Sequence, residues 1–272
     1  MDQAAKTNTP TSAYISNPLL MISPSASALG VNLSSLLGMF GLMLSPFPVM
    51  IIASAVAFGL RDSGIGLIIS LTAGLLALLA FVVLLLVSLP TYAIILIASV
   101  KGQKIGLRAA LAQARMFIVP SLGLSLLTAL AVIGGLLLFI IPGLIFIAWF
   151  SLSQYAMVAE NLGVIESMKR SKQLVKGRVW EMWSLIMLPS MAGVIPFVGG
   201  LINFVLSIAL IPSMALRYVQ LVGSKPEDRP KVHWSNYALI IVAIVAGVAL
   251  AGASVASFQE INQELSSPTY TY

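Results

Sequence analysis

The chain has 272 residues, of which 59% are hydrophobic and 9% are charged, and its mean hydropathy is +1.01. Soluble domains carry about 25% charged residues because their surface faces water, so this composition excludes an ordinary soluble domain and indicates a surface that faces lipid. The sequence contains no cysteine, which excludes disulfides, thiolate metal sites and a cysteine nucleophile.

Residues 1–33 are rich in Ser, Thr, Asn, Ala and Pro. They do not place a basic segment before a short apolar core, so they do not have the pattern of a cleavable signal peptide. We expect a flexible N-terminal tail, because such a composition buries little apolar surface.

Seven apolar stretches follow the tail. Helices are expected, because only helices and closed barrels satisfy the backbone polar groups in lipid, and long apolar runs without alternation exclude a barrel. The predicted fold class is therefore all-α, a polytopic transmembrane helical bundle of about seven spans, each crossing needing roughly 20 apolar residues. The predicted spans, within a transmembrane domain at 34–257, are about 34–60, 64–100, 118–140, 143–159, 179–195, 199–221 and 236–257.

Prolines leave the span count open at two places. Pro46 and Pro48 divide the first stretch, and Pro90 is expected to kink the second, whose end would emerge at the cytoplasmic interface. The count therefore ranges from about six to about eight spans.

The distribution of charge predicts a topology. All but one of the fifteen Lys and Arg residues lie in the tail or in connections that seven spans place on one side, and the exception is Arg61. The positive-inside rule then predicts a multi-pass protein of the cytoplasmic membrane, with a cytoplasmic N-terminus. The short C-terminal tail, 258–272, would be extracytoplasmic.

Two of the basic connections, 104–118 and 162–179, are predicted to be amphipathic helices. Each has an apolar stripe at helical spacing with basic residues beside or opposite it, as in helices that lie in the headgroup plane. The simpler alternative is that they are basic connectors that obey the positive-inside rule. The candidate contacts to anionic lipid or to a partner are Lys104, Arg108, Arg115, Lys169, Arg170, Lys172, Lys176 and Arg178.

Each amphipathic helix precedes two spans joined by a predicted tight turn. Pro ends a helix and Gly permits a close turn. The repeated order of amphipathic helix, span, turn and span suggests a parallel internal duplication. The residues assigned to the two turns are Pro142, Gly143, Pro196, Gly199 and Gly200.

Residues 141–183 resemble a family of bacterial membrane proteins named for the membrane domain that accompanies some glycerophosphodiester phosphodiesterases. The resemblance is carried by Pro142-Gly143, Glu160, Gly163, Ser171 and Lys176-Gly177-Arg178. It implies a membrane-embedded helical architecture. It does not imply phosphodiester hydrolysis, because that chemistry belongs to a separate soluble barrel with histidine and carboxylates, and the one histidine in this chain is His233.

Three charged residues lie near predicted span ends, namely Glu160, Glu181 and Arg217. We expect interfacial ion pairs that hold helices in register, such as Glu160 with Arg217 or with Arg178. His233, beside Trp234, is expected to be an interfacial anchor, since one histidine without carboxylate neighbours makes no metal site. No catalytic or cofactor-binding motif occurs, so neither an enzyme nor a cofactor is predicted.

The function favoured is that of a non-enzymatic membrane protein that associates with lipid or forms the membrane part of an envelope assembly. The alternative is a permease-like transporter of a small or lipid-like solute, which would need a polar path built from residues such as Ser125, Ser151 and Gln154. The partners considered are the phospholipid bilayer, anionic headgroups, a second copy of the chain or another membrane protein. Nucleic acid is not expected as a partner.

Overall fold

The computed structural model describes residues 14–60, 64–192 and 199–266. Within these ranges every regular element is a helix, as expected for a chain whose apolar segments satisfy their own backbone hydrogen bonds. The elements are η1 Pro18–Met21, α1 Ile22–Val31, α2 Leu33–Leu44, α3 Pro46–Gly59, α4 Gly64–Val100, α5 Leu107–Ala114, η2 Arg115–Phe117, α6 Ile118–Leu138, α7 Ile140–Phe150, α8 Ser153–Glu160, α9 Val164–Val175, α10 Val179–Ala192, α11 Gly199–Ala209, α12 Ser213–Gly223, η3 Pro226–Asp228 and α13 Trp234–Ser266.

Five helical stretches in the described part of the chain are long and apolar enough to cross a membrane. They are Leu33–Val56, Leu71–Val100, Leu107–Leu138, Ile140–Glu160 and Gly200–Gly223. The two further predicted spans, 179–195 and 236–257, coincide with α10, which has 14 residues, and with the long helix α13. The all-α, membrane-type prediction is confirmed at this level, and the count of seven spans stays a prediction.

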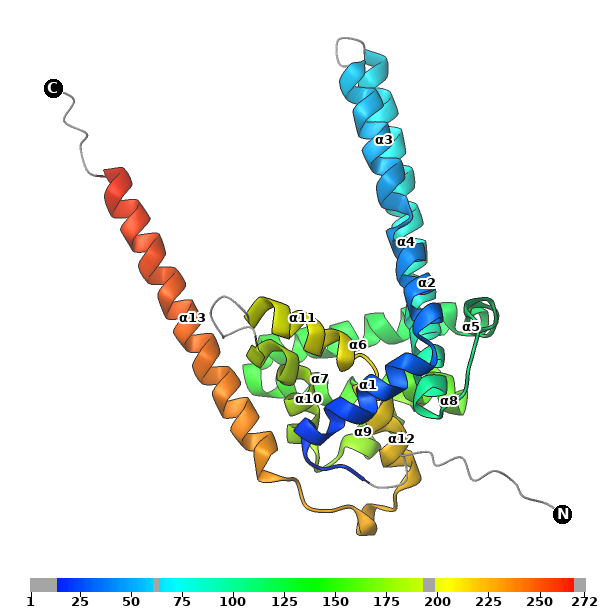
Figure 1. Ribbon diagram of the computed structural model, residues 1–272, viewed down its shortest axis with the longest axis vertical. Coiled ribbons are helices and arrows are strands. Elements are labelled where there is room, and N and C mark those ends of the chain that lie inside the picture. The colour runs from blue at the N-terminus through cyan, green and yellow to red at the C-terminus, as the bar shows by residue number, and fades with distance from the viewer. Residues whose placement is uncertain (1–13, 61–63, 193–198, 267–272) are drawn as a thin grey trace.

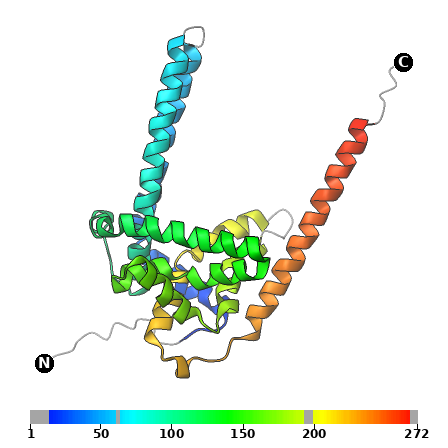
Figure 2. The same ribbon diagram turned by 180° about the vertical axis from the view of Figure 1, so that it is seen from behind.

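Helices α3, α4 and α13 project from a base that contains α1 and α5 to α12 (Figure 1). The antiparallel hairpin of α3 and α4 extends away from the base, and α13 leans out on the same side. Both views place α6 across the direction of this hairpin (Figure 2). The largest buried cluster lies in the base, where α4 contacts α1, α2, α5, α6, α8 and α12.

Helix α4 changes its surroundings along its length. Its outer part exposes leucines such as Leu71, Leu75 and Leu79, whereas its last residues, including Ile95 and Val100, are buried. We expected this end to emerge at an interface. The last turns of α4 are surrounded by other helices of the same chain, and the location of this end at a membrane interface stays a prediction.

Pro90 does not interrupt α4, which is helical on both sides of it. Proline cannot donate a backbone hydrogen bond. Nearby hydroxyls bond to carbonyl groups of the same turns: Thr91 Oγ1 donates to the Val87 carbonyl at 2.6 Å, and Ser88 Oγ donates to the Leu85 carbonyl at 2.7 Å.

The N-terminal segment is more ordered than the composition suggested. The expectation of a flexible tail does not hold for residues 14–33, where η1 and α1 form and where Met21, Ser25 and Ala28 are buried. The physical reason is that α1 packs against α4, α11 and α12. These contacts compensate for the conformational entropy that the segment loses when it becomes ordered. Residues 1–13 lie outside the described part.

The first hairpin turns earlier than predicted. Phe139 is extended, with φ −161° and ψ 148°, whereas Pro142 and Gly143 lie in the first turn of α7. Gly143 has a packing role: a Cβ there would lie 2.8 Å from the Leu136 backbone nitrogen, and one on Gly135 would lie 2.9 Å from Gly143 Cα. The two glycines therefore allow α6 and α7 to approach closely. Of the second predicted turn, Gly199 and Gly200 begin α11, and Pro196 lies outside the described residues.

Helices form in both regions predicted to be amphipathic. Segment 104–118 contains α5, η2 and the start of α6, and segment 162–179 contains α9. The buried side of α9, which includes Ser171 and Val175, packs against α6, α7, α8 and α12. Part of the apolar side of α9 therefore contacts protein, and a location of this helix in the headgroup plane stays a prediction.

Candidate functional site

The predicted basic contact residues fall into two groups on either side of α8, which contacts both α4 and α9. In the first group Lys104 lies in the α4–α5 connection, Arg108 lies on α5 and Arg115 begins η2. All three are exposed. These side chains are available to a ligand or to lipid.

The second group surrounds α9, where Lys169, Lys172 and Lys176 are exposed. Lys172 Nζ lies 4.3 Å from the centre of the Trp149 ring, a cation–π contact. Neither Lys169 nor Lys176 forms an ion pair with any other described residue. The outer side of α9 therefore carries cationic side chains that the rest of the described chain does not neutralise.

Ser171, which is buried on α9, forms hydrogen bonds with the residues at the break between α7 and α8. Its Oγ donates to the Trp149 carbonyl at 2.5 Å and accepts from the Leu152 backbone N–H at 3.2 Å. This buried hydroxyl thereby sets the position of α9 and of the lysines on its outer side.

Arg170 is held by Glu160. Its Nε lies 3.0 Å from both carboxylate oxygens of Glu160, and the Tyr218 hydroxyl donates to the same carboxylate at 2.8 Å. An ion pair at Glu160 was expected, but with Arg217 or Arg178. That choice of partner was wrong, because Arg170 on the adjacent α9 is within reach and both expected arginines bind another carboxylate.

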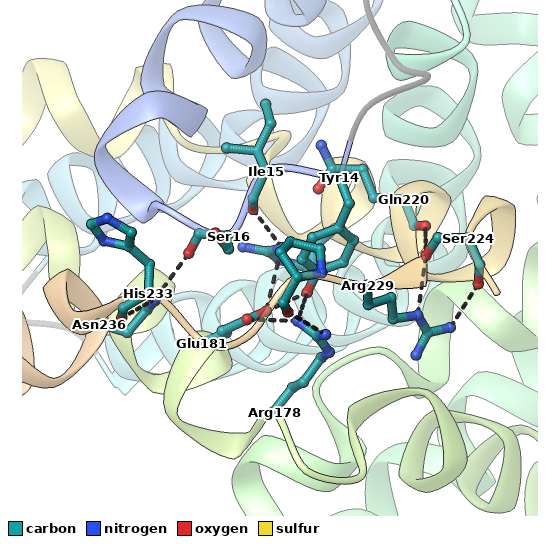
Figure 3. A network of polar contacts seen from close by, with 12 residues as sticks. Tyr14, Ile15, Ser16, Arg178, Glu181, Gln220, Ser224, Arg229, His233 and Asn236 are labelled. Atoms are coloured by element: carbon teal, nitrogen blue, oxygen red, sulfur yellow. Dashed lines mark hydrogen bonds and ion pairs between the residues drawn. The ribbon is translucent and has the colours of Figure 1, made fainter. Parts of the chain in front are cut away.

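That carboxylate belongs to Glu181, at the centre of a largely buried cluster that we call the charge cluster: Tyr14, Arg178, Glu181 and Arg217. Figure 3 labels Tyr14, Arg178 and Glu181 of this cluster. Arg178 Nη1 donates to Glu181 Oε1 at 2.7 Å, and Arg217 Nη1 lies 3.4 Å from Glu181 Oε2. The Tyr14 hydroxyl donates to Glu181 Oε2 and accepts from Arg178 Nη1. Arg178 is therefore not available to lipid, in contrast to the prediction.

The charge cluster contains two guanidinium groups and one carboxylate, so one positive charge is not compensated within it. The Tyr14 ring lies against both cations, 4.6 Å from Arg178 Cζ and 5.0 Å from Arg217 Cζ. Such contacts offset part of the cost of desolvating a cation. Burial raises the pKa of the Tyr14 hydroxyl to about 12; Arg217 acts to lower this pKa, and Glu181 acts to raise it.

Backbone carbonyls complete the coordination of the two arginines. Arg217 Nη1 donates to the Ile15 carbonyl at 2.8 Å, and Arg178 Nη2 donates to the Pro230 carbonyl at 2.8 Å. Arg217 Nε has no hydrogen-bond partner among the described residues. The charge cluster thus joins the N-terminal segment, α10, α12 and the connection that precedes α13.

A second polar group ties the start of α13 to the same segment. Asn236 donates to the Ser16 carbonyl at 2.9 Å and accepts from Ser184 Oγ on α10 at 2.5 Å. His233, expected to be an interfacial anchor, accepts at Nδ1 from the Ser235 backbone N–H at 3.2 Å. It therefore caps the first turn of α13.

Sequence reasoning found Arg178, Glu181 and Arg217 but missed Tyr14 and Asn236. Tyr14 lies in a segment whose polar composition indicated disorder, and its partner Glu181 is 167 residues away. The available signal was an isolated aromatic residue just before Pro18, which is a weak indication of a docked segment.

The described residues contain no group of three or more His, Asp or Glu side chains that could hold a metal ion. The fold defines a class: an all-helical protein with several helices of membrane-spanning length and apolar composition. Comparison with known proteins found no matching family model, no matching curated protein and no matching solved structure.

Proposed function

We propose that this chain is a non-enzymatic integral membrane protein that associates with anionic lipid headgroups through the outer side of α9. The observation that carries the proposal is the exposure of Lys169 and Lys172 on the short, firmly packed α9 and of Lys176 directly after its last residue. Each Lys or Arg near an anionic membrane surface contributes about 1 kcal/mol to attachment.

The position of α9 in the chain supports this role. It begins at Val164, directly after Ile140–Glu160, a helix long and apolar enough to cross a membrane. A basic element at the end of a span lies near the headgroups if the span crosses the bilayer. The resemblance of residues 141–183 to the named membrane domain belongs to the same proposal, since it implies a membrane-embedded chain without the catalytic barrel.

Transport is supported less well by the geometry. Gln154, a candidate for a polar path, donates to Ser121 Oγ at 2.8 Å, and Ser151 donates to the Ala148 carbonyl at 2.8 Å. Both side chains thus serve contacts within or between helices. We therefore propose lipid association in preference to solute transport.

The test compares two pairs of exposed lysines in the full chain. Lys169→Gln with Lys176→Gln removes two charges from α9, and Lys225→Gln with Lys231→Gln removes two from the connection between α12 and α13. After extraction in a mild detergent, native mass spectrometry measures the anionic lipid that each form retains. We expect the α9 pair to lose several times more lipid than the control pair, and equal losses would contradict the proposal.

A further inference from the structure

A pocket of about 370 Å³ lies where the end of α4, the α4–α5 connection, α5 and α8 meet. Its polar lining consists of Lys101, Gln103 and Lys104 from the connection and Gln113 from α5. The lining thus offers two ammonium groups and two amides, and it includes no carboxylate. Such a set of donors suits a phosphate group, for which lysine serves as a point-charge ligand.

The remainder of the lining is apolar. Ile94, Ile97 and Ala98 come from the buried end of α4, and Val158 comes from α8. A pocket with an apolar wall and a few convergent polar groups is the usual form of a small-molecule site. Here the wall would accommodate the hydrocarbon next to a phosphate, so the lining matches an amphipathic ligand.

The connection that carries the two lysines has a defined backbone structure. Gly102 has φ +70°, the Gln103 N–H donates to the Ala98 carbonyl at 2.8 Å, and the Gly102 N–H donates to the Ser99 carbonyl at 3.0 Å. These bonds form a Schellman motif, which satisfies two carbonyls at the end of α4. The negative end of α4 is thereby partly neutralised at the mouth of the pocket.

Asn32 fixes the same connection from the other side. Its amide donates to the Gln103 carbonyl at 2.8 Å and to Ser99 Oγ at 3.0 Å, and its Oδ1 accepts from the Ile105 N–H at 2.8 Å. Ser35 Oγ donates to the Ile105 carbonyl at 2.7 Å. The pocket wall is therefore preorganised, which lowers the entropy cost of binding.

The charge of the pocket is not cancelled by its nearest acidic neighbour along α8. Glu160 follows Ala159, which lines the pocket, but its carboxylate binds Arg170 and the Tyr218 hydroxyl. Lys101 and Lys104 are both exposed, and neither forms an ion pair with another described residue. The site therefore presents a positive potential to an anion.

We infer that this pocket binds the phosphate-bearing headgroup of one membrane lipid, an inference that rests on the proposed lipid association. The pocket adjoins the end of Leu71–Val100, one of the helices able to cross a membrane. A headgroup there would place its phosphate between the two lysines and its glycerol carbons against the α4 wall. Binding would be saturable at one lipid per chain, in contrast to the diffuse attraction by α9.

Native mass spectrometry of the full chain in detergent, titrated with phosphatidic acid, measures the affinity for the first bound lipid. We expect Lys101→Gln with Lys104→Gln to weaken this affinity about 25-fold, since each lysine near an anionic headgroup contributes about fivefold. The matched control, Lys225→Gln with Lys231→Gln, removes the same charge outside both the pocket and α9 and leaves the first-lipid affinity unchanged. Gln113→Leu, which alters no charge, weakens it severalfold.

Equal losses from the two lysine pairs, or full affinity in Gln113→Leu, would overturn the inference while leaving the proposed function standing. Absence of any anionic lipid binding by the unaltered chain would overturn both. A last experiment measures whether soluble glycerol 1-phosphate competes with the bound lipid. If it displaces the lipid at concentrations equal to those of the lipid itself, the site recognises a free phosphate compound and the lipid assignment is wrong.

Discussion

Arg217 and Glu181 face each other in the interior of the protein, with both side chains fully buried and Arg217 Nη1 3.4 Å from the Glu181 carboxylate. Glu181 also accepts from Arg178 at 2.7 Å. One carboxylate therefore pairs with two cations, and it holds α10 against α12.

Replacing Glu181 with Gln should destabilise the protein strongly. The variant leaves two guanidinium groups without a counter-charge, and breaking a buried pair in this way costs about 3–5 kcal/mol. Thermal unfolding in detergent, followed by tryptophan fluorescence, should show a large fall in Tm. Glu166→Gln is the matched control, because Glu166 is exposed on α9, and a fall of equal size there would contradict the role of Glu181.

Replacing Tyr14 with Phe should have a smaller effect than replacing it with Ala. Phe keeps the ring against Arg178 and Arg217 but loses the hydroxyl, whose hydrogen bonds to charged groups contribute about 1.5–3 kcal/mol. Ala loses both kinds of contact. Denaturant unfolding of the two variants checks the order, and equal stability of Tyr14→Phe and Tyr14→Ala would show that the ring contacts contribute nothing.

The Tyr14 hydroxyl should also give the stability a specific pH dependence. Burial raises its pKa to about 12 in the folded protein from 10.0, so the folded state holds its proton more tightly than the unfolded state. The contribution is fully present below pH 10 and is lost as the pH rises toward 12. Comparing Tm between these pH values in the unaltered chain and in Tyr14→Phe isolates this loss, and parallel curves would contradict it.

The α6–α7 hairpin allows a test in which adjacent glycines should behave differently. A Cβ on Gly135 would lie 2.9 Å from Gly143 Cα, whereas a Cβ on Gly134 would have no neighbour within 4 Å. Gly135→Ala should therefore cost about 1–3 kcal/mol through overpacking. Gly134→Ala should be neutral or slightly stabilising, because Ala is the better helix former by about 1 kcal/mol. The Tm values of the two variants test this difference in stability. Equal shifts would exclude the close approach of α6 and α7 as the cause of a loss of stability in Gly135→Ala.

Asn32 offers a test of the α4–α5 connection. Asn32→Ala leaves the partly buried Ile105 N–H and Gln103 carbonyl without their partner, and a buried group left unsatisfied costs about 1–3 kcal/mol at most in such a position. Hydrogen exchange should then increase at residues 101–106 more than in α9. Ser34→Ala, at an exposed position nearby, serves as the control, and unchanged exchange in Asn32→Ala would show that the connection holds its shape without this side chain.

Several features of the protein could be predicted from the sequence because they depend on local or compositional rules. Low charge and long apolar runs lead to membrane-type helices, since each segment must satisfy its own backbone hydrogen bonds. The helices at 107–114 and 164–175 follow from the spacing of apolar and basic residues. The need for ion pairs at Glu160, Glu181 and Arg217 follows from the cost of leaving charge unpaired near a membrane.

The identity of the partners was decided by the tertiary structure alone. Glu160 binds Arg170 rather than Arg217. Glu181 binds Arg178 and Arg217, the two arginines that were expected to pair with Glu160, and it also accepts a hydrogen bond from Tyr14, which lies 167 residues away in the sequence. The end of α4 is buried because other helices of the chain surround it. Hydropathy and charge patterns predict whether a residue needs burial or an ionic partner. They do not predict the distance between two segments that are far apart in the sequence. Packing brings those segments together, and it thereby determines which lysines remain free to meet a ligand and which arginines are used to hold the fold.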